Sequence, residues 1–326
     1  MTKVPLYRQA IRESWQLAWR HKSLWIFGLF AAFLGQMGML ELVMKVGLVG
    51  SNYAFFPNWI LLPEFVGSPF LQDSFTLPID GWMWFLWLVV VFIGFGLLFI
   101  FVSVASQGAL VHSTAQFVRK KKLLDIDVAW QAGTKHFWRL FFLNLLKKIA
   151  LLAFAILMGF ATVNVIINAS GADFIIFVLL FILVVIVGMI LSFLAIYAAG
   201  YVVVEEYSLG NAIEAAWKLF LDHWLVSIEV GLIILFLNIV LGVVVLASFF
   251  LLFLPTLFLW VIAIQIVSST LYFIAMMAGL ALFLLFIVFA GSVFSVFTTA
   301  SWTYLFMKMH KHGIGSRVLG WAGFHS

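Results

Sequence analysis

The chain has 326 residues, of which 65% are hydrophobic and only 10% are charged, and its formal net charge is +5. Soluble domains are about half apolar and about a quarter charged, so this composition excludes a soluble fold. The sequence contains no cysteine, which excludes a disulfide framework and a thiol catalyst.

Uncharged apolar runs follow one another along the whole chain. A transmembrane helix needs about 20 apolar residues, and each run is long enough for at least one crossing. The runs are 23–40, 81–118, 149–167, 174–204 and 230–307, the last of which is long enough for two helices. The sequence therefore predicts an all-α fold, a polytopic transmembrane bundle of about six spans in one membrane domain, 1–326.

A short segment ahead of each odd-numbered span carries the same pattern, a tryptophan followed six residues later by a histidine. The tryptophans are Trp15, Trp130 and Trp217, and the histidines are His21, His136 and His223. Apolar and charged residues fall on opposite faces at helical spacing, which is typical of a helix at the headgroup level. We therefore predict an internal repeat of an amphipathic interfacial helix and a transmembrane hairpin, with the tryptophans as interfacial anchors. The three units are 1–122, 123–207 and 208–326.

The first connection between spans, 41–80, is much longer than its counterpart in the second unit. It contains four of the six prolines and several glycines, which interrupt regular helices. It is also rich in aromatic residues. We expect this external loop to fold back on the membrane surface.

The last apolar run is divided by Pro255. We expect membrane helices over 225–254 and 271–306, with 256–269 lying at the outer interface or extending one of the two helices. A third crossing over 256–269 is the alternative. Basic residues follow the run, and six crossings place them on the same side as the other basic loops.

The basic residues lie on one side of this predicted topology. All except Lys45 precede the first span, separate the second from the third or the fourth from the fifth, or follow the sixth. An excess of Lys and Arg marks cytoplasmic loops, so we expect both termini in the cytoplasm and the body in the bacterial inner membrane. The positive charge then reflects topology and attraction to anionic headgroups, and no nucleic-acid partner is expected.

The repeated histidines are a candidate metal site. If the three units pack around a pseudo-threefold axis, His21, His136 and His223 converge, and imidazole nitrogens bind zinc. The alternative is that each histidine caps or anchors its own interfacial helix. Because zinc ligands are usually close in sequence and these are far apart, the second interpretation is favoured, and no metal or cofactor is expected.

Charged groups inside spans are a second candidate, because a charge in the hydrocarbon layer is costly and points to function. Glu229 lies about one turn into the fifth span, and Lys147 and Lys148 lie at the start of the third. An ion pair between Glu229 and one of the lysines, with Asn238 nearby, would form a polar membrane site. The alternative is that the third span begins at Ile149 and the lysines reach outward to the headgroups.

No nucleotide-binding loop, metalloprotease motif or hydrolase elbow is present.

The junction 200–213, GYVVVEEYSLGNAI, runs into Trp217 and resembles a group of bacterial six-span proteins. That group includes the membrane domain attached to some glycerophosphodiester phosphodiesterases and related inner-membrane proteins. The resemblance implies a membrane body only, since the phosphodiesterase activity of such fusions resides in a separate barrel of about 250 residues.

These patterns favour a non-enzymatic integral membrane protein that serves as a lipid- or envelope-associated scaffold. Its expected partners are membrane lipids, other proteins or a second copy of the chain. The alternative is a transporter or permease that uses Glu229, Lys147 and Lys148, because internal repeats and buried charges are common in transporters.

Overall fold

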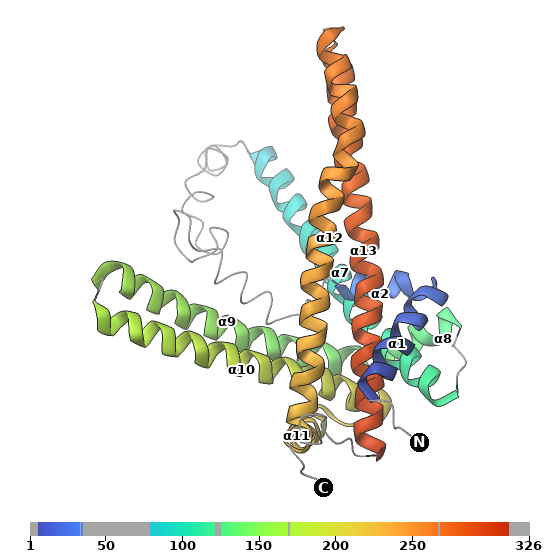
Figure 1. The fold of residues 1–326 in the computed structure, drawn as a ribbon, viewed down its shortest axis with the longest axis vertical. Helices are drawn as coiled ribbons and strands as arrows, with labels where there is room; N and C mark the ends of the chain where they lie inside the picture. Colours follow the sequence, from blue (N-terminus) through green and yellow to red (C-terminus); the bar gives the residue numbers. More distant parts are fainter. Residues whose placement is uncertain are drawn as a thin grey trace. The chain divides into compact units, whose positions relative to one another are not determined.

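A computed structural model of the chain describes residues 6–32, 34, 79–120, 125–168, 170–266 and 268–312 (Figure 1). Every regular element in these ranges is a helix. The helices are α1 (Leu6–Arg20), α2 (Leu24–Ala32), α7 (Ile79–Lys120), α8 (Ile126–Lys135), α9 (Phe137–Asn168), α10 (Gly171–Val204), α11 (Leu209–Asp222), α12 (Trp224–Gln265) and α13 (Ser269–His312). The external loop expected over 41–80 lies almost entirely outside the described residues.

Five of these helices, α7, α9, α10, α12 and α13, are long and apolar enough to cross a membrane. The prediction of an all-helical fold is therefore confirmed for the described residues, and the five helices are consistent with an integral membrane protein. The first expected span, 23–40, is described only in part, and α2 covers nine residues of it.

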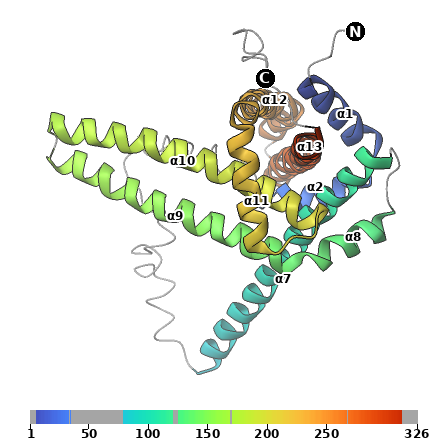
Figure 2. The ribbon, with the colours of Figure 1, turned by 90° about the horizontal axis from the view of Figure 1, so that it is seen from below.

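The helices divide into two compact units, and each is described by itself. Unit 1 consists of the described residues of 1–34, 103–137 and 197–326, and unit 2 consists of those of 35–102 and 138–196. In unit 1, α13 packs against α12, α2 and α1, as seen end-on in Figure 2. The core cluster joins Leu17 and Phe27 to Leu110, Phe297 and neighbouring small residues.

Two glycines let helices of unit 1 approach closely. A Cβ at Gly28 of α2 would collide with the carbonyl oxygen of Ser292 in α13, and a Cβ at Gly133 of α8 would collide with that of Ala105 in α7. Small residues at such crossings are typical of helix contacts in membranes. These crossings hold α2 and α8 against longer helices.

In unit 2, α9 and α10 form a hairpin. Met158 and Val184 are buried between the two helices, and aromatic residues including Phe154 and Phe181 pack around them. The Asn164 side chain donates a hydrogen bond of 3.0 Å to Asp173 at the turn.

The region 256–269 extends α12 instead of lying separately at the outer interface. Helix α12 continues through Pro255 to Gln265, and α13 begins after a short turn at Ser269. Between Trp224 and His312 the described residues thus form two helices, α12 of 42 residues and α13 of 44. Neither a third crossing nor a helix end at Leu254 is found there.

Candidate functional site

Each repeated histidine lies where an amphipathic helix ends and the next helix begins. His21 follows α1, and its backbone N–H donates to Leu17 at 3.2 Å while its carbonyl accepts from Leu24 at 3.1 Å. His136 lies between α8 and α9, and His223 lies between α11 and α12. Each histidine therefore directly follows the last residue of a helix, whereas each tryptophan lies inside its helix and does not open it, and the internal repeat stays a prediction.

Two of the histidine rings close the end of their own helix. Nδ1 of His136 donates to the carbonyl of Ala132 at 2.8 Å, and Nδ1 of His223 donates to that of Leu219 at 3.3 Å. The Leu219 carbonyl also accepts the backbone N–H of His223 at 3.1 Å, so the His223 ring adds a second bond to it. The rings of His136 and His223 thus bond to the last turn of their own helices, while the anchoring of all three helices by their histidines stays a prediction.

The three histidines have separate surroundings. The ring of His21 meets Phe117 edge-on at 6.0 Å between centroids, and His136 is buried. Among the described residues, no group of three His, Asp or Glu side chains is arranged to hold a metal ion. The convergence of His21, His136 and His223 around a metal therefore has no support in this part of the chain.

His21 is the junction histidine whose protonation is disfavoured. Partial burial lowers its pKa, and the positive charge of Arg20 beside it lowers it further.

The three anchor tryptophans differ in their exposure. Trp15 and Trp217 are 49% and 44% exposed, so each presents about half of its surface to the surroundings. Trp130 is only partly exposed because its ring stacks on Phe27 of α2, with 6.3 Å between centroids. Trp130 thus contributes to the core of unit 1, which its place in the sequence pattern did not predict.

The residues of the predicted polar membrane site belong to different units. Glu229 and Asn238 lie in α12 of unit 1, while Lys147 and Lys148 lie in α9 of unit 2. Glu229 is half-buried, and the Asn238 side chain donates to the Ile234 carbonyl of its own helix at 2.9 Å. Because α9 begins at Phe137, both lysines lie within the helix, and a membrane span that begins at Ile149 stays a prediction. The ion pair with Glu229 stays a prediction.

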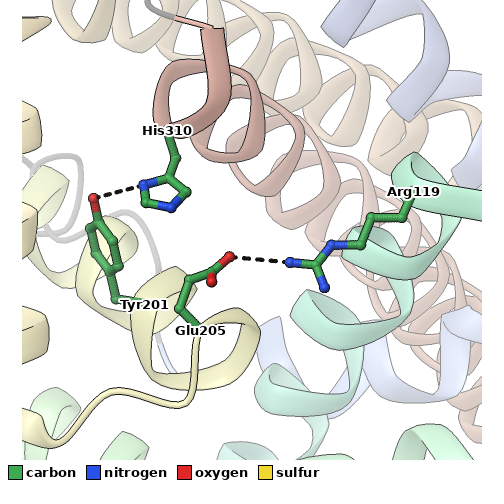
Figure 3. Close-up of polar contacts among 4 residues, drawn as sticks. All are labelled: Arg119, Tyr201, Glu205 and His310. Carbon is green, nitrogen blue, oxygen red and sulfur yellow. Dashed lines mark hydrogen bonds and ion pairs between the residues drawn. The ribbon is translucent and has the colours of Figure 1, made fainter.

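A second polar arrangement in unit 1 was not expected from the sequence. We call it the helix-end cluster, and it consists of Arg119 from the end of α7, Tyr201 and Glu205 from the end of α10, and His310 from the end of α13 (Figure 3). The Arg119 guanidinium donates to Glu205 at 3.1 Å, and the hydroxyl of Tyr201 is bonded to Nδ1 of His310 at 3.3 Å. The cluster ties together three helix ends that are distant in the sequence.

The acidic turn beside this cluster is also paired. Lys135, the last residue of α8, donates to Glu206 at 2.6 Å. Glu206 has φ of 58°, a left-handed conformation that a residue with a side chain adopts at a cost. The backbone N–H of Tyr207 returns to the carbonyl of Tyr201 at 3.2 Å and closes the turn. The carboxylates of Glu205 and Glu206 therefore each pair with a cation from another helix.

A buried bond lies next to the His223 junction. The Ser227 hydroxyl donates to the carbonyl of His223 at 3.0 Å, so the Tyr197 hydroxyl, 2.6 Å from the Ser227 oxygen, is the donor of the second bond. Tyr197 is fully buried. This relay fixes the end of α10 to the start of α12.

Two small hollows lie along the α12–α13 hairpin. Their volumes are about 270 and 160 Å3, and the residues around them include Phe253, Trp260, Tyr272 and Met276. Their walls are almost wholly apolar, and none of the predicted site residues lines either one. Pockets for small-molecule ligands usually combine apolar walls with a few polar groups, which these hollows largely lack.

No family model, curated protein or solved structure matches this chain. Functional arguments for it therefore start from its own residues.

Proposed function

We propose that the chain is a non-enzymatic integral protein of the bacterial inner membrane, a lipid- or envelope-associated scaffold with both termini in the cytoplasm. The observation that carries the proposal is the set of three junctions, where a short helix that carries both charged and apolar residues ends at a histidine and an apolar helix follows. A helix with tryptophan on one face and charges on another suits the headgroup level, and the apolar helix that follows suits the hydrocarbon layer.

The proposal includes the repeat. Each unit would place one interfacial helix on the inner leaflet and one hairpin across the bilayer, in the ranges 1–122, 123–207 and 208–326. The resemblance of residues 200–213 to the membrane domain of glycerophosphodiester phosphodiesterases supports the same arrangement, because that junction leads from a span through an acidic turn into α11. The helix-end cluster and the Lys135–Glu206 pair would brace the inner ends of the helices.

The long apolar helices support a role in which lipids or protein partners are held along the body. Large aliphatic and aromatic side chains are exposed along α7, α9, α10, α12 and α13. Such surfaces need lipid, another protein or a second copy around them. A scaffold of this kind acts through the surfaces it presents and needs no reacting group.

The proposal is tested by extracting the full chain from its membrane in polymer-bounded lipid discs. The lipids and proteins in the discs are compared with those of the bulk membrane, and the lipid profile of a deletion strain is measured beside them. We expect enrichment of a lipid class or of a stoichiometric partner, and an altered envelope in the deletion strain. A disc composition equal to the bulk, an unchanged deletion strain, or turnover of glycerophosphodiesters by the purified chain would overturn it.

Transport is the second candidate, and the observation that favours it is the half-buried carboxylate of Glu229 within α12. An ionisable group inside a span is a functional candidate by default. Lys147, Lys148 and Asn238 would complete the polar site. Substrate flux into liposomes that is lost in Glu229→Gln, but kept in Lys218→Gln outside the spans, would favour a permease over a scaffold.

A further inference from the structure

The exposed faces of the amphipathic helices α1, α8 and α11 differ in charge. α11 exposes Glu214, Lys218 and Asp222, and the first two pair at 2.7 Å. α8 exposes Asp127 and Lys135, and Lys135 is paired with Glu206. α1 exposes Arg8, Arg12 and Arg20 without an exposed carboxylate. Of these three helices, α1 therefore presents a basic face.

Two of these arginines line up with two tryptophans. At 3.6 residues per turn, Arg8, Arg12, Trp15 and Trp19 fall within an arc of about 60° on α1. All four side chains are exposed, and we call them the α1 stripe. The buried residues of α1, Ala10, Ser14 and Leu17 among them, lie on the opposite side, and α1 packs on α13.

The tryptophans of the α1 stripe are held in place from one side. The ring of Trp15 meets Phe297 edge-on at 5.6 Å between centroids, and the ring of Trp19 meets Trp25 at 5.9 Å. Even so, the two tryptophans remain 49% and 44% exposed. Side chains that are already ordered lose little conformational entropy when a ligand binds.

The carboxylate of α1 is turned away from the α1 stripe. Glu13 accepts a bond of 3.0 Å from Gln9 and is bonded to Tyr304 of α13. By angle it lies about 100° or more from the four residues of the stripe. The stripe thus keeps the positive charge of its two arginines.

We propose that the α1 stripe binds the headgroups of anionic phospholipids. The guanidinium of arginine matches phosphate oxygens with two parallel hydrogen bonds, and tryptophan rings sit at the boundary between headgroup and acyl chain. Lys22, exposed in the turn after α1, adds a further cation near the end of this helix. The inference rests on the proposed association with membrane lipids and names the lipid class and the surface that selects it.

The test counts lipids that remain bound to the purified full chain by native mass spectrometry, after titration with equal amounts of phosphatidylglycerol and phosphatidylcholine. We expect the wild type to retain more phosphatidylglycerol. Arg8→Gln with Arg12→Gln should reduce this preference by a factor on the order of five per arginine, since each basic residue near an anionic surface contributes about that much. Arg8→Lys with Arg12→Lys keeps the charge but not the paired hydrogen bonds. Its preference for phosphatidylglycerol should lie between those of the wild type and the double Gln variant.

The matched control removes two cations elsewhere. Lys120→Gln with Lys218→Gln changes the net charge equally and should lower the preference by less. Equal losses in both double variants, or an unchanged preference in the arginine variant, would overturn the proposal. Binding of polyglutamate without any preference for phosphatidylglycerol would assign the stripe to an acidic protein and would also overturn it. A failure here leaves the extraction experiment on the scaffold unaffected, so the two proposals are judged separately.

Discussion

The hydroxyl of Tyr197 donates a hydrogen bond of 2.6 Å to Ser227, and both residues are buried where α10 meets α12. Ser227 in turn donates to the carbonyl of His223, so the Tyr197 side chain is linked through Ser227 to a helix junction 26 residues further along the chain.

Tyr197→Phe should lower the free energy of unfolding by about 0.5–1.5 kcal/mol, because the buried Ser227 oxygen loses the hydrogen bond that it accepts while its bond to His223 remains. The measurement is denaturant unfolding of the full chain in detergent. Ser106→Ala is the matched control, since the hydroxyl of Ser106 is buried but has no hydrogen-bond partner among the described residues. A loss of similar size in the control would show that the bond itself contributes nothing.

The ion pair between Arg119 and Glu205 should be coupled more strongly than an ion pair on a free helix surface. The side chains of Arg119 and Glu205 are 42% and 28% exposed, whereas those of Lys218 and Glu214 are 70% and 67% exposed. Solvent weakens the second pair more. A double-mutant cycle with Gln at each position should give a coupling of up to about 1 kcal/mol for the first pair and a smaller coupling for the second. Couplings that are equal, or that do not fall in high salt, would contradict this account.

Glu206 offers a test of backbone strain. Glycine adopts a positive φ without cost, so Glu206→Gly should be more stable than Glu206→Gln by about 1 kcal/mol, although both lose the bond to Lys135. Thermal unfolding of the two variants side by side isolates the backbone contribution. Equal stability would mean that the left-handed turn is not retained.

Gly133→Ala should destabilise unit 1 by about 1–3 kcal/mol, because the added methyl group meets the backbone of α7 at Ala105, which has no freedom to move aside. Gly210→Ala, near the start of α11, places its methyl group in open space. Alanine is the better helix former, so this second variant should be neutral or more stable. Thermal unfolding in detergent distinguishes the two, and an equal response of both variants would argue against the close crossing of α8 and α7.

The lowered pKa of His21 predicts how the stability of the folded chain changes at acidic pH. A group whose pKa is lower in the folded chain than in the unfolded chain is protonated first in the unfolded state, so stability falls as the pH decreases through about 6.5 toward the folded value. The unfolding temperature should therefore drop between about pH 8 and about pH 5. Comparison with His21→Gln isolates the contribution of this side chain. If both proteins respond identically to pH, His21 is not its source.

The sequence pattern predicted the helix junctions well because it records local requirements. A histidine directly follows the last residue of α1, α8 and α11, and the change to uninterrupted apolar sequence marks the helices that come next. Pro255 was harder to interpret. The helix continues past it, and Thr256, one residue further on, packs against Gly279 of α13. Contacts with a partner helix outweigh the local preference of proline for a helix break.

The helix-end cluster could not be predicted in the same way. Arg119 and Glu205 are 86 residues apart, and Tyr201 and His310 are 109 apart. Nothing in either neighbourhood specifies its partner, because long-range pairing depends on how the helices pack. The partial burial of Trp130 could not be predicted for the same reason, because it depends on the packing of Phe27 against the Trp130 ring.

The length of the α12–α13 hairpin has a consequence for the bilayer around it. A helix of 42 residues is about 63 Å long, roughly twice the thickness of the hydrocarbon layer. Even a tilt of about 40°, at the upper end of the observed range, leaves about three quarters of that length along the membrane normal. The hydrophobic mismatch is therefore larger than tilt can absorb, so the bilayer must thicken locally or the apolar tip beyond Pro255 must be covered by another hydrophobic body.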